Sequence, residues 1–286
     1  MIDCHTHVGE SDVHLGGEFM ADARRAWGAS LQVGTTLDQH WEAVRTVEAA
    51  IVLAFAAPAV GFVVPNDYVA AYVSEHPDKL VGFASVDPND KDAPFELREA
   101  IENLGLQGLK LGPIYQHFDP LAESAFAVYE AAQELGLPIM WHQGTTFVRD
   151  APLAWARPMA LDEVARSFPR LRIVIAHLGH PWMEEAMATI RKHPHLFADI
   201  SALESRPWQY YNGLIAALEY GVEEKILFGT DYPFSTMERT LGGLRGINSL
   251  TEGTRLPRVP DDVIESIIER PTLELLGLAE SASGRP

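Results

Sequence analysis

The chain begins Met1-Ile2-Asp3-Cys4-His5-Thr6-His7, a short apolar start that ends in two histidines. In a strand, side chains alternate between two sides, so His5 and His7 face one side while Cys4 and Thr6 face the other. Two imidazoles on one side, about 6–7 Å apart along the strand, form half of a metal site. Cys4 is then turned away from them and is expected to be a small packing residue. Because chance often produces a His-x-His pair, its meaning depends on the rest of the chain.

Short apolar runs of this kind recur along the chain, with helical patterns between them. Eight are found, at residues 1–4, 50–55, 80–86, 108–111, 138–141, 172–176, 196–200 and 225–228. From the second run onward their starts lie 24 to 34 residues apart, the length of one strand, one helix and two loops. Alternating strands and helices imply parallel pairing with right-handed crossovers. Eight such units favour an α/β fold of the closed (β/α)8 TIM-barrel type over an open doubly wound sheet.

The stretches between the runs have the periodicity and end signals of amphipathic helices. These helices are expected at residues 37–49, 94–104, 123–135, 161–168, 183–192, 209–219 and 261–276. Two connections are unusually long, residues 8–36 and 235–259, and both are expected to hang over one mouth of the barrel. Since no linker interrupts the pattern, we expect a single barrel domain over residues 1–286, in which residues 281–286 form a frayed tail.

Composition excludes several classes of partner. Forty acidic against 22 basic residues give a net charge of −18, which argues against a nucleic-acid partner, because such a partner requires a basic face. The longest apolar stretch, residues 51–64, is shorter than the ~20 residues of a membrane span. Cys4 is the sole cysteine, so no internal disulfide forms, and no signal-type segment opens the chain. We therefore expect a soluble, cytoplasmic protein without a membrane partner.

Polar residues stand at the ends of several later runs. His142 follows the fifth run, His177 the sixth and Asp231 the eighth, and Lys110 lies near the end of the fourth. Active sites of (β/α)8 barrels lie at the C-terminal ends of the strands. A single histidine after an apolar run is more often a hydrogen-bonded core residue. The joint occurrence of these placements with the histidine pair of the first run favours a metal site.

These motifs resemble the amidohydrolase superfamily of metal-dependent barrels, and within it the amidohydrolase-related group that includes aminocarboxymuconate semialdehyde decarboxylase and dicarboxylate lactone hydrolases. The resemblance extends from the first strand through His177-Leu178-Gly179-His180-Pro181-Trp182 to Gly229-Thr230-Asp231-Tyr232-Pro233. It implies one divalent metal, Zn²⁺ in the first place and Mn²⁺ or Fe²⁺ as alternatives. The implied metal ligands are His5, His7, His142 and Asp231. His177 resembles the uncoordinated histidine that acts as acid or base or polarises the substrate.

Two reactions of a small carboxylated substrate fit this resemblance. In the leading hypothesis, a metal-activated water hydrolyses an ester, lactone or amide, while Asp231 passes a proton to the leaving group and His177 stabilises the oxyanion. In the alternative, the same site binds an unsaturated or aromatic acid, protonates the carbon next to its carboxylate and releases CO2. A non-catalytic binding barrel is disfavoured because none of the four implied ligands is missing. The resemblance also implies a homodimer.

Lys110 is a candidate substrate ligand with three interpretations. First, it binds a substrate carboxylate or pairs with a group near Asp231; second, it forms a structural ion pair; third, it is a carbamate that bridges two metals. Relatives in the group often have Lys-Leu-His-Pro at this point, and here Gly112 stands in the place of the histidine.

Residues on loops near the expected mouth complete the candidate site. His180 either contacts substrate or anchors its loop. Arg149 and Arg157, after the fifth run, are expected to bind a carboxylate in a bidentate manner, with surface salt bridges as the alternative. Aromatic residues on these loops suit a flat, conjugated substrate, and they are Trp155, Trp182, Trp208, Tyr210 and Tyr232.

Overall fold

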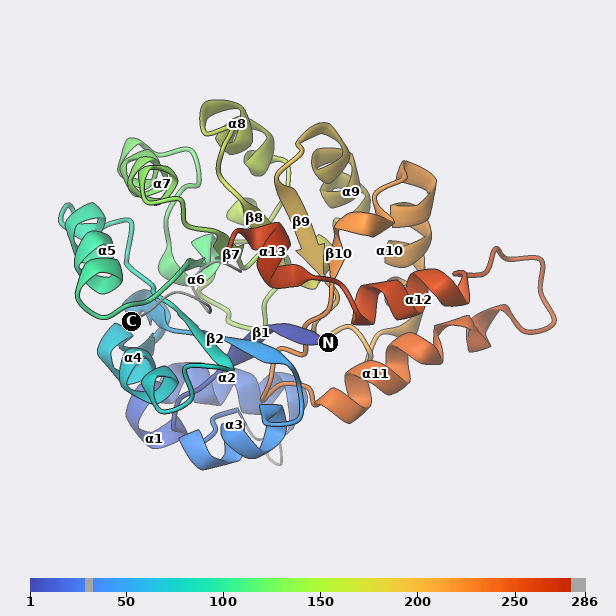
Figure 1. Ribbon diagram of the computed structural model, residues 1–286, viewed down its shortest axis with the longest axis horizontal. Helices are drawn as coiled ribbons and strands as arrows, with labels where there is room; N and C mark the ends of the chain where they lie inside the picture. The colour runs from blue at the N-terminus through green and yellow to red at the C-terminus, as the bar shows by residue number, and fades with distance from the viewer. Residues whose placement is uncertain (29–32, 279–286) are drawn as a thin grey trace.

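Eight parallel strands of the described chain form the wall of a barrel (Figure 1). The computed structural model describes residues 1–28 and 33–278. In chain order the strands are β1 (Ile2–His7), β2 (Ala49–Leu53), β5 (Leu80–Phe83), β6 (Leu109–Leu111), β7 (Ile139–Trp141), β8 (Ile173–Ile175), β9 (Leu196–Asp199) and β10 (Ile226–Leu227). They coincide with the eight apolar runs, which confirms the (β/α)8 prediction.

Hydrogen bonds close the sheet on itself. The strands pair in two groups, in the orders β1-β2-β5 and β10-β9-β8-β7-β6. The amide of Lys110 donates to the carbonyl of Ala84 over 2.6 Å, which joins the end of β5 to β6. The amide of Cys4 donates to the carbonyl of Phe228 over 3.0 Å, which joins β1 to the segment after β10. These eight strands therefore run in one direction around a closed barrel, and their C-terminal ends meet at one mouth.

Helices surround the barrel (Figure 1). They include α3 (Leu37–Val44), α4 (Asn66–Ser74), α5 (Ala93–Glu102), α7 (Glu123–Glu134), α8 (Ala160–Ser167), α9 (Met183–Lys192), α10 (Pro207–Tyr220), α12 (Asp261–Ile268) and α13 (Thr272–Leu276). Most match the predicted helices closely. Helix α3 is shorter than predicted because Ala49 begins β2, and the weakly amphipathic α4 is absent from the prediction. The helix predicted at 261–276 is two helices, because Pro271 lacks the amide that a continuous helix requires.

The stretch between β2 and α4 contains a small antiparallel hairpin. It consists of β3 (Phe55–Ala57) and β4 (Phe62–Val64), joined by a short 3-10 helix, Pro58–Val60. Gly61 adopts a left-handed conformation, φ 70°, which glycine does without steric cost. The hairpin places Phe55 and Phe62 beside the mouth of the barrel.

A bulge in β1 changes the expected alternation of its side chains. Asp3 pairs with Ala50 and Thr6 with Val52, so β1 holds one extra residue between these pairs. The Thr6 hydroxyl faces outward and donates to the carbonyl of Ile51 over 2.6 Å. Cys4 is fully buried inside the barrel, and not on the far side of the strand as alternation predicted. The prediction that it is a packing residue is confirmed.

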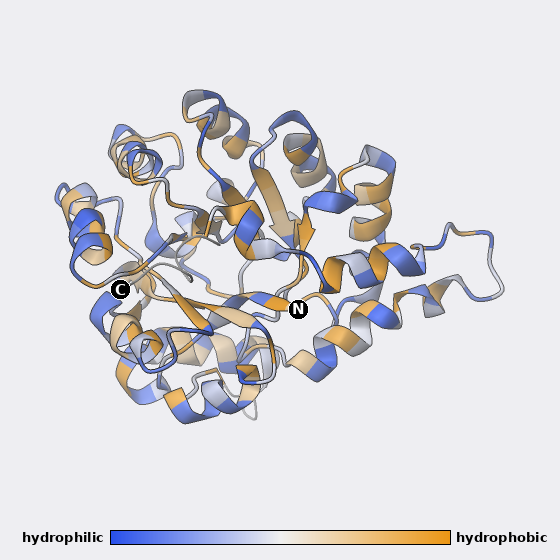
Figure 2. Cartoon of the chain, viewed as in Figure 1, coloured by the Kyte–Doolittle hydropathy of each residue, from blue (hydrophilic) through white to orange (hydrophobic). Residues whose placement is uncertain are grey.

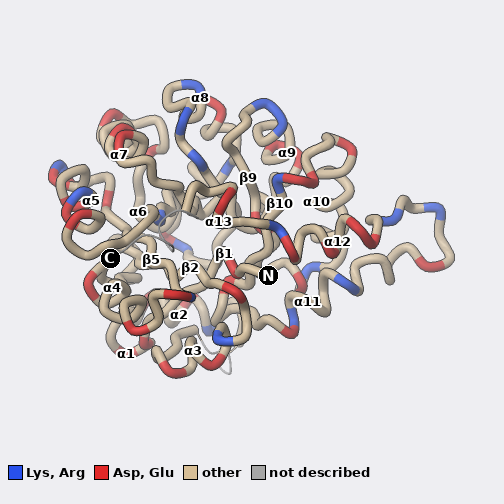
Figure 3. The backbone as a smooth tube through the Cα atoms, in the orientation of Figure 1, with Lys and Arg blue, Asp and Glu red and all other residues tan. Residues whose placement is uncertain are grey.

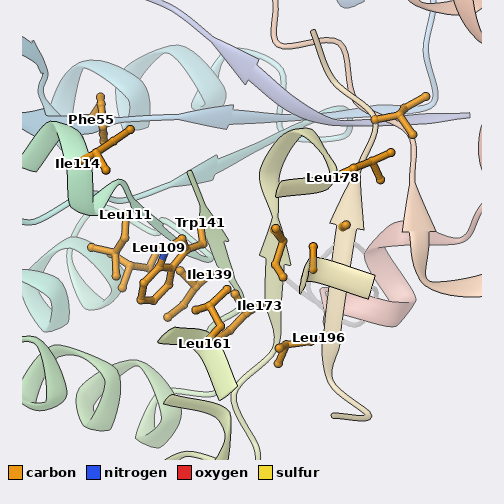
Figure 4. Packing of buried hydrophobic residues seen from close by; sticks show 14 of the residues in the cluster. Phe55, Leu109, Leu111, Ile114, Ile139, Trp141, Leu161, Ile173, Leu178 and Leu196 are labelled. Carbon is orange, nitrogen blue, oxygen red and sulfur yellow. The ribbon is translucent and has the colours of Figure 1, made fainter. Parts of the chain in front are cut away.

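The hydrophobic core forms two layers. The inner layer fills the barrel on the side away from the mouth, and its members include Cys4, Ile51, Leu53, Phe83, Met140, Val174, Phe197, Leu227 and Leu276. The outer layer packs the opposite faces of the strands against the helices, and Figure 4 shows Leu109, Leu111, Ile139, Trp141 and Ile173 there. Most strand residues are accordingly apolar, except in β1 and at Lys110 and Asp199, whereas the helices carry both apolar and polar residues (Figure 2).

The two long connections lie in different places. Residues 8–36 contain α1 (Ser11–His14) and α2 (Gly17–Trp27), and α2 covers part of the mouth as expected. Residues 235–259 contain α11 (Met237–Arg245) and a short helix, Ile247–Thr251, which pack against α10 and α12. A loop beyond them extends away from the barrel (Figure 1). The expectation that this second connection covers the mouth is wrong, because Leu244 and Ile247 bury their side chains at the flank of the barrel.

Charged residues of both signs lie on the outer helices and loops (Figure 3). No helix in the described ranges is long and apolar enough to cross a membrane. The tail predicted at residues 281–286 lies outside the described residues.

The inner layer can be tested by truncation of Leu276, which is fully buried. Leu276→Ala is expected to lower the free energy of unfolding by about 2–5 kcal/mol, because it removes apolar contacts and leaves a cavity. Urea denaturation followed by circular dichroism measures this change. Leu121→Ala, at a side chain that is 47% exposed, is the control and is expected to change stability by less than about 0.5 kcal/mol. Equal losses in both variants would contradict the core position of Leu276.

Candidate metal centre

Three side-chain atoms form a close triangle at the mouth of the barrel. His5 Nε2 lies 3.2 Å from His7 Nε2, and each nitrogen lies 3.3 Å from Asp231 Oδ1. The two histidines end β1, and the amide of Asp231 donates to the carbonyl of His5 over 2.8 Å. A tetrahedral shell with bonds of ~2.0–2.1 Å has edges of ~3.3 Å, so the triangle has the size of one face of such a shell.

The backbone of Asp231 is strained and is held by its neighbours. Its φ of 63° is left-handed, a conformation that costs a non-glycine residue about 1–3 kcal/mol. The preceding Thr230 donates its amide and hydroxyl to the buried carboxylate of Asp3, over 2.9 and 2.7 Å. Burial raises the pKa of Asp3 to about 7, although these hydrogen bonds oppose the change. This anchoring fixes the turn that directs Asp231 toward the histidines.

Burial keeps the histidines of the site neutral. It lowers the pKa of His5 to about 4 and the pKa values of His7 and His142 well below their usual range, and the nearby Lys110 ammonium adds to the effect. Neutral imidazole is the form that binds a metal. Burial raises the pKa of Asp231 and the Asp199 carboxylate adds to the rise, while the Lys110 ammonium opposes it.

Two buried nitrogens at the site have no hydrogen-bond partner among the described residues, His7 Nδ1 and His142 Nε2. His142 follows β7, and its ring centre lies 5.2 Å from that of His177 and 4.7 Å from that of Tyr115. A buried polar atom without a partner is costly. A metal ion bound at His142 Nε2 would remove this cost, and imidazole nitrogens with a carboxylate oxygen are donors that suit a divalent metal.

His177 lies at the edge of the same cluster. It occupies a turn after β8 in which His177 and Leu178 have φ values of 56° and 51°. Ring nitrogens of His177 and His5 and a carboxylate oxygen of Asp231 lie within 4.8 Å of one another. The Nδ1 atom of His177 lies 2.8 Å from the Ser201 hydroxyl and 3.1 Å from the Ser201 carbonyl. This leaves Nε2 as the nitrogen available to a ligand in the mouth.

Lys110 extends from β6 into the barrel beside the triangle. Its Nζ lies 3.3 Å from His5 Nε2 and 5.8 Å from the centre of the Phe55 ring. Burial lowers the pKa of Lys110 to about 8, while the carboxylates of Asp231 and Asp199 oppose the change. Since the side chain also lines the mouth cavity, its position suits the first of its three interpretations, an ammonium that binds a substrate carboxylate.

A cavity of about 310 Å³ opens above these residues. Its walls are largely aromatic and are formed by Phe19, Trp27, Phe55, Phe62, Tyr115, Phe147 and Phe234. None of the aromatic residues that the sequence placed at the mouth lines this cavity. The cavity thus has the aromatic walls that the sequence predicted, but other residues form them. Most of these rings come from α2 and the β3–β4 hairpin.

The four expected substrate ligands separate into two groups. Lys110 and His180 line the cavity, and His180 Nε2 also hydrogen-bonds to the Gln209 side chain, which anchors its loop. Arg149 and Arg157 do not line this cavity, so their predicted contact with substrate has no support from its lining. Arg149 Nε pairs with Asp22 Oδ1 over 2.8 Å.

Arg157 pairs with Glu185 on the surface of the barrel, and its side chain is 58% exposed. The arginine that does line the cavity is Arg206, in the connection between β9 and α10. Arg206 lies seven residues after Asp199, the last residue of β9. A search for polar residues at the ends of strands therefore does not identify it.

Two buried residues at the end of the seventh apolar run were not predicted, Asp199 within the run and Ser201 directly after it. The Asp199 carboxylate lies 2.8 Å from His5 Nδ1 through Oδ2 and accepts the amide of His177 over 2.9 Å through Oδ1. The Ser201 hydroxyl lies 2.5 Å from Asp199 Oδ1. Asp199 is the last residue of β9. The signal that identified the other candidate ligands, a polar residue at the end of a strand, would therefore have identified Asp199 as well.

A (β/α)8 barrel that gathers neutral histidines and an aspartate at the C-terminal ends of its strands defines a class, the barrel enzymes that work with a bound metal. The chain belongs to the amidohydrolase family, because residues 2–272 match the sequence model of that family. This confirms the resemblance drawn from the sequence. The family is metal-dependent.

A curated relative is 2-amino-3-carboxymuconate-6-semialdehyde decarboxylase from Dictyostelium discoideum. It is 26% identical over 243 residues, which cover 74% of this chain and 65% of the relative. The match thus spans slightly less than two thirds of the length of that protein.

Solved structures share the fold over nearly the whole chain. An uncharacterised TIM-barrel protein from Bordetella bronchiseptica has a TM-score of 0.77 at 20% identity, with 98% of this chain and 99% of that one covered. A probable 2-pyrone-4,6-dicarboxylic acid hydrolase from Acinetobacter baumannii, with citric acid bound, has a TM-score of 0.66 at 16% identity and coverage of 96% and 98%. A dihydroxybenzoic acid decarboxylase from Polaromonas, with manganese bound, has a TM-score of 0.62 at 16% identity and coverage of 97% and 97%.

The metal ligands can be identified by substitution. We expect the purified chain to hold about one divalent metal ion, and His142→Ala and Asp231→Ala to lose most of it because each removes a ligand. His177→Asn is expected to keep its metal. Elemental analysis after exhaustive dialysis measures the occupancy, and circular dichroism checks that each variant is folded. Loss of metal in His177→Asn with retention in His142→Ala would show that the ligand roles of these two histidines are exchanged.

Proposed function

We propose that the protein is a metal-dependent decarboxylase that removes CO2 from a small unsaturated or aromatic acid. The sequence favoured hydrolysis, and the amidohydrolase family includes relatives of both kinds. The observation that carries the proposal is the contrast between the floor and the walls of the cavity. Its floor holds the ionisable groups, whereas seven aromatic rings form most of its walls. The decarboxylases among the similar proteins add support.

The walls of the cavity suit a flat, conjugated substrate. Aromatic faces stack on planar groups, and the cavity of about 310 Å³ limits the substrate to a small molecule. Two cationic side chains, Lys110 at the floor and Arg206 at the side, are available for carboxylates. We infer that a carboxylate enters toward Lys110 while the conjugated part of the acid lies between the rings.

The proposed ligands of one divalent metal are His5, His7, His142 and Asp231, with Zn²⁺ and Mn²⁺ as the leading candidates. When bound, the metal supplies a Lewis acid that polarises a substrate oxygen. The Lys110 ammonium attracts the substrate carboxylate and, being buried, does so in a medium where charges interact strongly. The aromatic walls exclude water from the carbon that is to be protonated.

His177 is the proposed proton donor. The bond between the substrate carbon and its carboxylate breaks, the electron pair stays on that carbon, and CO2 leaves. The same carbon then takes one proton, so that one acid and one proton give one CO2 and one protonated product. His177 Nε2 suits this role, because Nδ1 keeps its hydrogen bond to Ser201 and the imidazole lines the cavity. In each turnover Nε2 first takes up one proton from solvent and then passes it to the substrate carbon.

Hydrolysis of a dicarboxylic lactone is the second candidate. It is favoured by the structural similarity to the pyrone dicarboxylate hydrolase and by the position of Asp231, whose Oδ1 lies on the triangle where it can accept a proton from water. The two candidates use the same floor of the cavity and differ in whether water enters the product.

Product analysis distinguishes the two reactions. The protein loaded with Zn²⁺ or Mn²⁺ is incubated with 2-amino-3-carboxymuconate semialdehyde, with a dihydroxybenzoic acid and with 2-pyrone-4,6-dicarboxylate. We expect CO2 release from one of the two acids without incorporation of ¹⁸O from labelled water into the other product, because no water takes part. Ring opening of the pyrone with ¹⁸O uptake, and no CO2 from either acid, would reject the decarboxylase and leave the hydrolase.

The role of His177 has its own test. His177→Asn is expected to lower kcat for CO2 release by about 10²–10⁴-fold, because it removes the proton donor. Its metal content, measured in the same preparation, is expected to match that of the unmodified protein. An unchanged kcat would assign proton transfer to another group.

A further inference from the structure

The buried carboxylate of Asp199 connects two histidines of the site. Its Oδ2 lies 2.8 Å from His5 Nδ1. Its Oδ1 accepts three donors, the amides of His177 and Ser201 over 2.9 and 3.0 Å and the Ser201 hydroxyl over 2.5 Å. Ser201 Oγ in turn lies 2.8 Å from His177 Nδ1. Asp199 and Ser201 are fully buried, so water does not compete for these bonds.

The donors and acceptors of this cluster assign its hydrogens, including the one on His5 Nδ1, which also lies 3.2 Å from Ser201 Oγ. Lys110 Nζ lies 3.3 Å from His5 Nε2, and an ammonium only donates, so Nε2 is the accepting nitrogen of His5. Asp199 Oδ1 accepts from two backbone amides, and Oδ2 faces His5 Nδ1. Ionised Asp199 only accepts hydrogen bonds. The proton between Asp199 Oδ2 and His5 therefore lies on His5 Nδ1. The one hydroxyl proton of Ser201 lies toward Asp199 Oδ1, the stronger acceptor.

The same donors and acceptors fix the protonation of His177. The Ser201 hydroxyl uses its hydrogen in the bond to Asp199, so Ser201 Oγ can only accept from His177 Nδ1. The Ser201 carbonyl, 3.1 Å from the same nitrogen, accepts as well. His5 and His177 thus both carry their proton on Nδ1 and present the lone pair of Nε2. For His5 this atom belongs to the triangle, where it lies 3.2 Å from His7 Nε2. For His177 it is the atom free to face the cavity.

We propose that Asp199, acting through Ser201, is a positioning residue that sets the same tautomer on His5 and on His177. One carboxylate then prepares a metal ligand and the acid–base residue together. Hydrogen-bond partners of this kind orient the ligand ring and commonly change metal affinity by about 10–100-fold. The part that concerns His177 rests on the proposed function, whereas the part that concerns His5 depends only on metal binding.

Asp199→Asn is the sharpest test because it keeps the shape of the side chain. Three donors point at Oδ1, so the amide oxygen occupies that position and the NH2 group faces His5 Nδ1. The proton of His5 must then move to Nε2, where it blocks the lone pair that the triangle requires. We expect metal affinity to fall by about 10–100-fold although no ligand is removed.

Nitrogen NMR on the metal-free protein reads the tautomers directly. In protein labelled with ¹⁵N-histidine, His5 and His177 are assigned by the loss of their signals in His5→Gln and His177→Asn. We expect both to show the Nδ1–H form in the unmodified protein, and His5 to change to the Nε2–H form in Asp199→Asn. An Nε2–H form of His5 in the unmodified protein, or an unchanged His5 in a folded Asp199→Asn variant, would overturn the proposal.

The matched control is Asp162, which forms an aspartate–histidine pair far from the mouth, with Oδ1 2.7 Å from His193 Nε2. Asp162→Asn is expected to leave metal affinity and the signals of His5 and His177 unchanged. An equal loss of metal affinity in Asp162→Asn and Asp199→Asn would mean a general effect of charge, and would reject the proposal.

Ser201 provides a second variant that decides the question if Asp199→Asn does not fold. Ser201→Ala is expected to keep the metal and KM but to lower kcat by about 10–100-fold, because His177 is less well oriented. Ser201→Thr, which keeps the hydroxyl, is expected to recover activity. Equal activity of Ser201→Ala and the unmodified protein would overturn the role of Ser201. If the unmodified protein releases no CO2 but Asp199→Asn still lowers metal affinity, the proposed reaction is rejected. The inference that Asp199 positions His5 is then supported.

Discussion

The closure of β1 against the segment after β10 is the constraint on which the site depends. It joins the first residues of the chain to residues more than two hundred positions later, through the amides of Cys4, His7 and Asp231. These bonds bring Asp231 Oδ1 to 3.3 Å from both His5 Nε2 and His7 Nε2. Without closure, the two halves of this triangle would belong to opposite edges of an open sheet. The other strands then bring His142, His177 and Lys110 to the same mouth, because parallel strands end on the same side.

The site concentrates groups that are unfavourable for folding. Asp199 and Lys110 are charged groups in the barrel interior, and His177 and Asp231 adopt left-handed backbone conformations. Each feature has a local compensation: Asp199 accepts four hydrogen bonds, and Asp3 holds the turn before Asp231. The inner hydrophobic layer beneath the site supplies much of the stability that this arrangement requires. Several strained and charged residues therefore gather near the mouth of the barrel, whereas the inner layer beneath them is apolar.

The fold was largely predictable because its signal is local. Eight apolar runs and the helices between them follow from periodicities of two and 3.6 residues, which depend only on neighbouring residues. The errors occur where local pattern is not decisive. The bulge in β1 moved Cys4 into the barrel, because register is set by the partner strand. The segment 235–259 reads as an ordinary long loop, and its position at the flank depends on apolar contacts with α10 and α12. Arg149 was expected in the cavity, but Asp22 of α2 binds it elsewhere.

By itself, the sequence determined the strand order, the family and the polar residues that end the strands, because each of these is encoded in short contiguous motifs. The tertiary structure alone decided which of these residues meet, since distances between strand ends depend on barrel closure. It also decided the aromatic walls, which come from α2 and the β3–β4 hairpin, and the choice of Arg206 over Arg149 and Arg157. The link from Asp199 through Ser201 to two histidines likewise depends on the tertiary structure. The tautomer of a histidine is set by its hydrogen-bond partners, and the residues of this link come from β1 and from the ends of β8 and β9.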